Sequence, residues 1–77
     1  MKFNVPVGKT IRVFTTTNLC VTGEFSGVNN DTLLMKDCVV KTPKEKYSSM
    51  GAFIEIEHIK KYKVLKFINN KFTFSNL

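Results

Sequence analysis

Gly23 stands in the middle of a segment, residues 19–26, that otherwise alternates between apolar and polar side chains. Leu19, Val21 and Phe25 share one face of this segment, and Gly23 falls on the same face because alternate residues of a strand point the same way. A glycine inside a strand marks a bulge or a sharp bend, the feature that curls a sheet into a small barrel. The position therefore predicts a strongly bent β-sheet.

Four further segments have the composition and two-residue period of strands, and none shows the sustained 3.6-residue period of a helix. These strands are expected at residues 10–15, 32–40, 52–57 and 61–68. The polar stretch 42–51 is expected to be an exposed hairpin loop, and residues 58–60 a linker. We predict an all-β fold, a small five-stranded, strongly bent SH3-like barrel.

The ends of the chain carry weaker patterns. Residues 3–8 have room for one or two helical turns at most, and Pro6 restricts them. Asn69 and Asn70 can turn the chain into a final ribbon at residues 71–74. We expect one domain over residues 1–77, with the barrel at about 8–67 and a C-terminal β-extension at 68–77. Phe72 and Phe74 are expected to pack against the barrel or a partner.

The size and composition exclude several classes of function. A chain of 77 residues forms one marginally stable domain, which favours association with a partner subunit. Two cysteines and one histidine are too few for a disulfide scaffold or a common zinc site. No nucleophile–base pair or phosphate loop is present, so we expect no enzyme activity, cofactor, metal or small-molecule substrate. No apolar run spans a membrane and no secretory signal stands out, so an intracellular location, cytoplasmic or nuclear, is expected.

The charge balance is the first positive indication of function. Twelve Lys and Arg residues against six Asp and Glu residues give a net charge of +6, which favours an anionic partner such as RNA. Arg12 is the single arginine, and lysine attracts phosphates without the bidentate geometry that reads bases. Weak, salt-sensitive RNA binding is therefore expected. A lysine-rich solvated surface without a ligand explains the same composition.

Residues 8–65 resemble an Sm/LSm (Sm-like) domain. The first motif of that family is matched by Ile11-x-Val13, Gly23-x-Phe25, Asn29 to Thr32, Leu33-x-Met35 and Asp37-Cys38. The second motif is matched by Phe53 to Ile59 followed by Tyr62-x-Val64-Leu65. The resemblance implies the bent barrel predicted above, and it places the long connection between the two motifs.

Departures from the motifs bear on RNA binding. Asp31 stands where ring-forming RNA binders carry a stacking side chain, Thr32 stands at their Asn, and Glu57-His58 replaces their Arg-Gly. An aspartate has no stacking face and repels phosphate, so the uridine pocket of those members is not expected. The chain is more similar to divergent scaffold members. Tyr62 to Leu65 resembles mRNA-decapping enhancers, Thr42-Pro43 resembles the gemin subunits of the SMN complex, and both groups stay open.

Two sets of candidate residues follow from the resemblance. The candidate RNA-binding residues are Asn29, Asn30, Thr32, His58 and Lys60. Turn chemistry alone also explains the two asparagines, and His58 also reads as a simple linker residue. The candidate subunit interface consists of Phe53, Ile54, Glu55, Ile56, Glu57, Lys61, Lys63, Leu65 and Phe67. In this interface the fourth strand of one subunit adds to the fifth strand of the next, and acids face lysines across the junction.

Lysines and aromatic residues also alternate along the C-terminal part of the chain. This run comprises Lys60, Lys61, Lys63, Lys66 and Lys71, interleaved with Tyr62, Phe67 and Phe72. Such a run is typical of a single-strand-binding platform, but plain strand alternation produces it as well. Cys20 and Cys38 fall opposite one another if the intervening turn centres on Asn29, which would allow a cross-strand disulfide. We expect both thiols to be reduced.

We therefore expect an Sm-like subunit that acts as an oligomerisation and interaction module in RNA metabolism, such as RNP assembly, mRNA processing or decay. Its partners would be other Sm-like subunits, in a homo- or hetero-oligomer. Two alternatives remain. One is an RNA-binding, Hfq-like homo-oligomeric ring, and the other is an OB-like protein that binds single-stranded nucleic acid.

Overall fold

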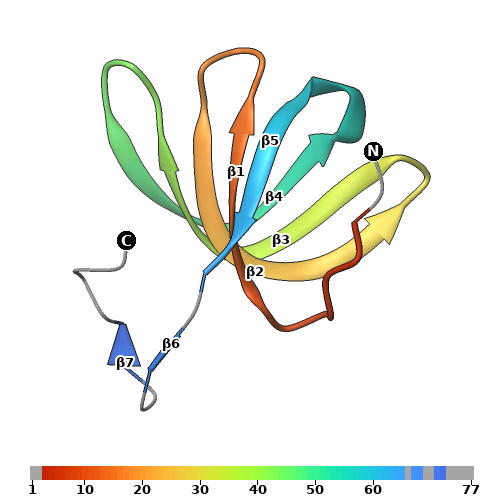
Figure 1. The fold of residues 1–77 in the computed structure, drawn as a ribbon. Coiled ribbons are helices and arrows are strands. Elements are labelled where there is room, and N and C mark those ends of the chain that lie inside the picture. Colours follow the sequence, from red (N-terminus) through yellow and green to blue (C-terminus); the bar gives the residue numbers. More distant parts are fainter. Residues whose placement is uncertain (1–2, 66, 69–70, 73–77) are drawn as a thin grey trace.

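A computed structural model describes residues 3–65, 67–68 and 71–72 of the chain. The elements are β1 (Thr10–Thr15), β2 (Cys20–Asn29), β3 (Thr32–Lys41), β4 (Lys46–Glu55), the 3-10 helix η1 (Ile56–His58), β5 (Ile59–Val64), β6 (Phe67–Ile68) and β7 (Lys71–Phe72). The first five strands form one sheet in the order β4-β3-β2-β1-β5, with every neighbouring pair antiparallel. Figure 1 shows how strongly β2 and β3 curve. The predicted five-stranded, bent all-β fold is confirmed.

The sheet bends at the position where Gly23 of β2 lies opposite β3. Thr22 pairs with Val39 but Glu24 pairs with Lys36, so β3 places two residues opposite Gly23 and forms a bulge. A Cβ atom on Gly23 would lie 2.9 Å from both Cys38 Sγ and the Lys36 carbonyl oxygen. The two strands approach this closely because position 23 has no side chain, which agrees with the role predicted for this glycine.

The core lies on the inner face of the curved sheet. Its buried members are Ile11, Val13, Val21, Phe25, Leu33, Met35, Cys38, Val40 and Ile59. In β1, and in β2 as far as Phe25, burial alternates strictly, as the two-residue period predicts. In β3 the alternation of buried residues shifts by one position at the bulge, so the buried residues are Leu33 and Met35 before it and Cys38 and Val40 after it. The bulge thus keeps both halves of β3 facing one core.

The stretch 42–51 is not a loop, which corrects the expectation from its polar composition. β3 and β4 extend as a ladder to the pair Lys41–Lys46, and only residues 42–45 form the turn. The Thr42 hydroxyl accepts hydrogen bonds from the backbone N–H groups of Lys44 and Glu45, which closes the turn tightly. The pattern concealed this strand because neither face of its first half is covered by the core.

The junction between β4 and β5 also differs from the expected boundaries. The fourth strand was expected to continue through residue 57, but β4 ends at Glu55 and Ile56–His58 form a 3-10 turn. β5 begins at Ile59, which is buried, and ends at Val64, so Phe67 belongs to the short strand β6. Ile56 and Glu57 therefore lie in a linker beyond the fourth strand.

The N-terminal segment covers one end of the core without forming a helix. Residues 3–9 contain a turn at Val7 and Gly8 in place of the expected helical turns. Phe3 packs against Tyr62 and Phe25, with ring centroids 4.5 and 6.2 Å apart. Gly8 N–H donates to the Phe25 carbonyl oxygen, which fastens this segment to β2.

β6 and β7 form a two-stranded ribbon in which Phe67 pairs with Phe72, in agreement with the ribbon expected after Asn69 and Asn70. Lys66, Asn69, Asn70 and residues 73–77, including Phe74, lie outside the described residues, as do the side chains of Phe67, Lys71 and Phe72. The expected packing of Phe72 and Phe74 is therefore not described. No helix among the described residues is long and apolar enough to span a membrane.

The two cysteines do not face one another. Asn29 pairs with Thr32, so the turn between β2 and β3 centres on residues 30–31 and Cys20 pairs with Lys41. Cys38 lies in the core beside Gly23, while Cys20 is half-buried on the outer face, and both thiols are free. The alternative of a cross-strand disulfide depended on a turn centred on Asn29, and it is wrong.

The two thiols are expected to react at different rates. Burial, with a smaller contribution from the neighbouring Asp37 carboxylate, raises the pKa of the Cys38 thiol above its ordinary value of 9.0. The neutral thiol therefore stabilises the fold below that pH, and this contribution is lost as pH rises through the folded-state pKa. A thiol-exchange assay should detect Cys20 first and Cys38 only on unfolding. Cys20→Ser should abolish the fast phase, and equal rates for both thiols would contradict this assignment.

Candidate functional site

β4 forms one outer edge of the five-stranded sheet, and its backbone is partly unpaired. Ile56 N–H donates to the Asp31 carbonyl oxygen at 2.9 Å. Because hydrogen-bonded pairs alternate in an antiparallel ladder, Ile54 is bonded to β3 while the backbone groups of Phe53 and Glu55 point away from it. The Phe53 side chain is 81% exposed beside these groups. This edge offers both backbone donors and apolar surface to a further strand.

β5 forms the opposite edge in the same way. Leu65 N–H donates to the Thr10 carbonyl oxygen at 2.9 Å, so the residues bonded to β1 are Lys63 and Lys61. The backbone groups of Tyr62 and Val64 therefore point away from the sheet. Unpaired edges of this kind are templates for pairing with another strand. Among the described residues, neither β4 nor β5 has a second partner strand.

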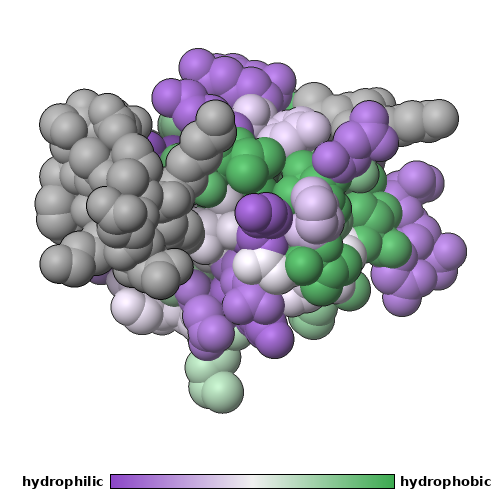
Figure 2. Space-filling view, turned by 60° about the horizontal axis from the view of Figure 1, so that its bottom comes forward, coloured by the Kyte–Doolittle hydropathy of each residue, from purple (hydrophilic) through white to green (hydrophobic). Residues whose placement is uncertain are grey.

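The expected interface residues are distributed over these two edges and the segments after them. Phe53, Ile54 and Glu55 lie on β4, Ile56 and Glu57 on η1, Lys61 and Lys63 on β5, Leu65 just beyond it, and Phe67 on β6. Ile54 and Ile56 pack against the core, whereas Phe53 reaches solvent. Figure 2 shows hydrophobic surface, in green, gathered between polar rims on one side of the molecule. Because Glu57 lies in the linker, the expected two-acid alternation on the fourth strand is reduced to Glu55.

The candidate RNA-binding residues surround one end of the sheet. Asn30 and Asp31 form a two-residue turn, with φ angles of 49° and 64°, and Asn29 pairs with Thr32 across it. This turn lies against η1 (Figure 1), and the two enclose a shallow pocket of about 660 Å³ lined by Asn30, Asp31, Glu55, Ile56, Glu57 and Ile59. The fold thus brings the turn and the linker together.

The chemistry of this end is acidic. Asp31, Glu55 and Glu57 line the pocket, and a carboxylate oxygen of Glu57 lies 3.9 Å from His58 Nε2. Lys60 is exposed beside it, where the register between β1 and β5 shifts. Three carboxylates repel a phosphate backbone. Glu55, Glu57 and His58 are all exposed, and clusters of this kind occur without a metal ion.

A second hollow lies on the outer face of the sheet and was missed by the sequence reasoning. It has a volume of about 690 Å³ and is lined by residues of β1, β2, β3, β4 and the β3–β4 turn. Arg12, Lys41 and Lys46 are its charged members. Side-chain alternation in β1 places Arg12 on the face opposite to that of the buried Ile11 and Val13. Which lysines lie beside Arg12 depends on the order and register of the neighbouring strands.

Known proteins were compared with the chain by sequence and by structure. No protein-family model and no curated protein matches the sequence. A heptameric archaeal Sm protein superposes with a TM-score of 0.68 at 15% identity, over 78% of this chain and 90% of that chain. The SmAP1 heptamer of P. aerophilum gives 0.68 and 15%, over 78% and 82% of the two chains. A chain of the NatC complex bound to CoA gives 0.69 and 15%, over 86% and 91%.

At this level of identity, the comparisons bear on the fold. Their agreement covers most of the chain in every case. The protein therefore has the Sm-like fold that its sequence motifs predicted.

Proposed function

We propose that this protein is an Sm-like subunit that assembles with other Sm-like subunits by pairing the β4 edge of one molecule with the β5 edge of the next. The observation that carries this proposal is the unpaired backbone at both edges, beside the exposed Phe53. Main-chain hydrogen bonds supply much of the affinity in such strand addition, and adjacent side chains supply specificity. Two of the structures with this fold are heptamers, which supports the same mode of use.

The proposed interface keeps the residues inferred from the sequence. Phe53 and Leu65 contribute apolar surface, with Phe67 following on β6, while Glu55, Lys61 and Lys63 contribute charge. Exposed ion pairs add about 0.2–1 kcal/mol each, so they would set the register of the two paired strands more than they would raise the affinity between subunits. The single domain expected over residues 1–77 is part of this proposal.

The cellular role that fits is an assembly module in RNA metabolism. In this role the subunit would join partners in RNP assembly, mRNA processing or decay. Asp31 at the turn and Glu57-His58 in the linker support a divergent scaffold, similar to decapping enhancers or gemin subunits, over a uridine-binding ring. RNA binding by Asn29, Asn30, Thr32, His58 and Lys60 stays a prediction, and the acidic pocket argues against high affinity there. The Sm-like fold also argues against the OB-like alternative.

Solution mass by light scattering tests the proposal directly. A ring-sized or dimeric mass of the purified protein is the expected result for self-association through the edges. If the protein is monomeric, mixing with individual Sm-like subunits should give a stoichiometric complex. A strictly monomeric protein that also forms no complex with any Sm-like subunit would refute edge pairing.

A further inference from the structure

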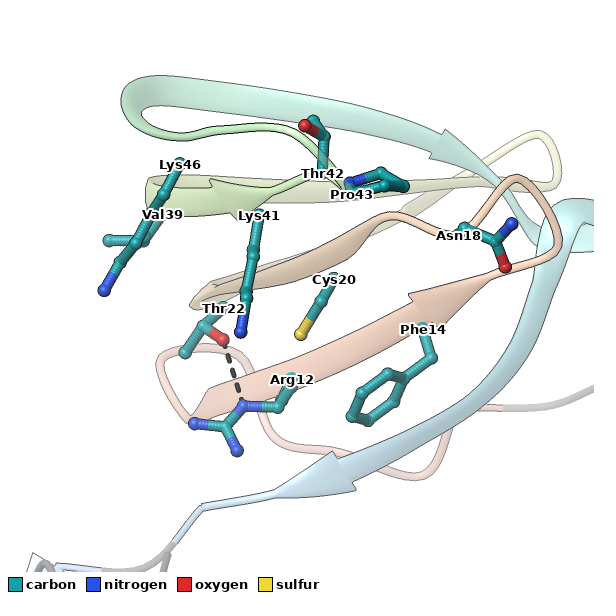
Figure 3. Close-up of a pocket in the computed structure, with 10 residues that line it drawn as sticks. All are labelled: Arg12, Phe14, Asn18, Cys20, Thr22, Val39, Lys41, Thr42, Pro43 and Lys46. Carbon is teal, nitrogen blue, oxygen red and sulfur yellow. Dashed lines mark hydrogen bonds between the residues drawn. The ribbon is translucent and has the colours of Figure 1, made fainter.

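The outer face of the sheet carries a groove that is lined by cations and an aromatic ring. Ile11, Val13 and Val21 point into the core, so the residues that alternate with them along β1 and β2 point to the outer face. Figure 3 shows this outward set converging from neighbouring strands. The groove is lined by Arg12, Phe14, Asn18, Cys20, Thr22, Val39, Lys41, Thr42, Pro43 and Lys46. Of the two edge strands, β4 contributes only Lys46 to this lining, and β5 contributes none of the described lining residues.

Positive charge is concentrated in and beside the groove. Arg12, Lys41 and Lys46 line it, and no acidic residue is among the described residues that do so. On β5, Lys63 pairs with Arg12 and Lys61 pairs with Phe14, so both lysines share this outer face. Three of the six acidic residues, Asp31, Glu55 and Glu57, line the pocket between η1 and the β2–β3 turn. Glu45, in the β3–β4 turn, and Glu24, which is paired with Lys36, are nearer the groove but do not line it. An anionic chain is therefore attracted to the groove and repelled from that pocket.

Arg12 and Phe14 are positioned by neighbours within the face. Arg12 Nε donates to Thr22 Oγ1 at 3.2 Å, which leaves the terminal guanidinium nitrogens directed away from Thr22 (Figure 3). Lys61 Nζ lies 5.0 Å from the centroid of the Phe14 ring. A phosphate bound by Arg12 would thus hold its nucleotide near the aromatic ring of Phe14. Cations interleaved with an aromatic ring are the composition of single-strand-binding grooves.

We propose that this groove binds a short segment of single-stranded RNA, with phosphates on Arg12, Lys41 and Lys46 and a base against Phe14. An acidic peptide would satisfy the cations but would not use the ring, so the aromatic surface favours nucleic acid. The cations carry no base-specific geometry beyond the single arginine, so little sequence preference follows. The three residues proposed to bind phosphate lie on a sheet face, and none of them belongs to the set proposed for edge pairing.

Fluorescence anisotropy with a short labelled single-stranded RNA tests the site. The full-length protein should bind at low salt, and its affinity should fall steeply as salt rises. The double variant Lys41→Gln/Lys46→Gln should reduce the slope of log affinity against log salt by about 1.4, since each phosphate contact on a single strand contributes about 0.7. Phe14→Leu should weaken binding about tenfold at fixed salt without changing that slope, because stacking is not electrostatic.

Lys9→Gln is the matched control, because Lys9 is an exposed lysine that precedes β1 and does not line the groove. It should leave the affinity for RNA within about twofold of the wild type and alter the salt slope little.

Cys20 supplies a readout in the unmodified protein, since it lines the groove while Cys38 is buried. Bound RNA should slow alkylation of Cys20. Circular dichroism of each variant separates loss of binding from loss of folding.

Several results would overturn the inference. No binding by the wild type at low salt would do so, as would an equal loss of affinity from Lys9→Gln and from the groove variants. RNA binding that leaves Cys20 alkylation unchanged would place the RNA elsewhere. Displacement of RNA by an acidic peptide that binds more tightly and is unaffected by Phe14→Leu would assign the groove to a protein partner. These assays do not depend on oligomeric mass. The groove proposal can therefore be refuted while edge pairing holds, and edge pairing can be refuted while the groove proposal holds.

Discussion

Gly23→Val is expected to unfold the protein. A β-carbon at this position meets Cys38 Sγ and the Lys36 carbonyl oxygen at 2.9 Å and the Cys38 Cα atom at 3.0 Å. Two of these three atoms belong to the backbone of β3, so rotating one side chain cannot relieve the contact. Overpacking costs about 1–3 kcal/mol in ordinary cores and more where the backbone must move. A domain of this length has a total stability of about 4–12 kcal/mol. The loss should be visible as a missing thermal transition by circular dichroism.

Gly23→Ala and Gly51→Ala provide a graded, matched pair. Both glycines lie in strands, where alanine is ordinarily favoured over glycine by about 0.5–1 kcal/mol. At Gly51 the added carbon lies at an ordinary 3.4 Å from the Met35 carbonyl oxygen, so that variant should keep wild-type stability or gain slightly. Gly23→Ala should lose about 3 kcal/mol in urea unfolding. A Gly23→Val protein with an unchanged melting temperature would show that β3 does not close on β2 as described.

Phe53→Pro is expected to dissociate the assembly while leaving the isolated subunit folded. The Phe53 N–H points away from β3. Proline at this position therefore removes a hydrogen-bond donor from the open edge without breaking a hydrogen bond within the chain. Proline is tolerated in edge strands for this reason. The mass measured by light scattering should fall from the oligomer to the single subunit, with an unchanged β-sheet circular dichroism spectrum.

Two further substitutions separate the backbone from the side chain. Phe53→Ala keeps the donor but removes the exposed ring, so it should weaken assembly less than Phe53→Pro does. Ile56→Pro is not a clean test, because the Ile56 N–H already donates to Asp31 within the chain and its loss would damage the fold. If Phe53→Pro remains fully assembled, the subunits associate by a surface other than the β4 edge.

Local patterns in the sequence were sufficient for the elements whose two faces differ. β1 and β2 alternate between core and solvent, so residues 10–15 and the bend at Gly23 could be predicted from side-chain period alone. The start of β4 could not, because an edge strand with polar residues on both faces has no period to read. Its extent depends on pairing with β3, from Lys41–Lys46 onward, and on the turn that Thr42 closes.

The same distinction holds for the functional surfaces. The order of the motifs in the sequence predicted the fourth and fifth strands, but the linker between them lies at residues 56–58 and not at 58–60 as expected. The motif order did not predict the cationic groove, because Arg12 is remote in sequence from Lys41 and Lys46 and meets them only through the antiparallel pairing of β1, β2 and β3. Which residues share a sheet face is determined by register, and a one-residue bulge reverses that choice downstream. The bulge opposite Gly23 is such a point: it turns Val39 and Lys41 to the outer face, and this placement required the tertiary structure.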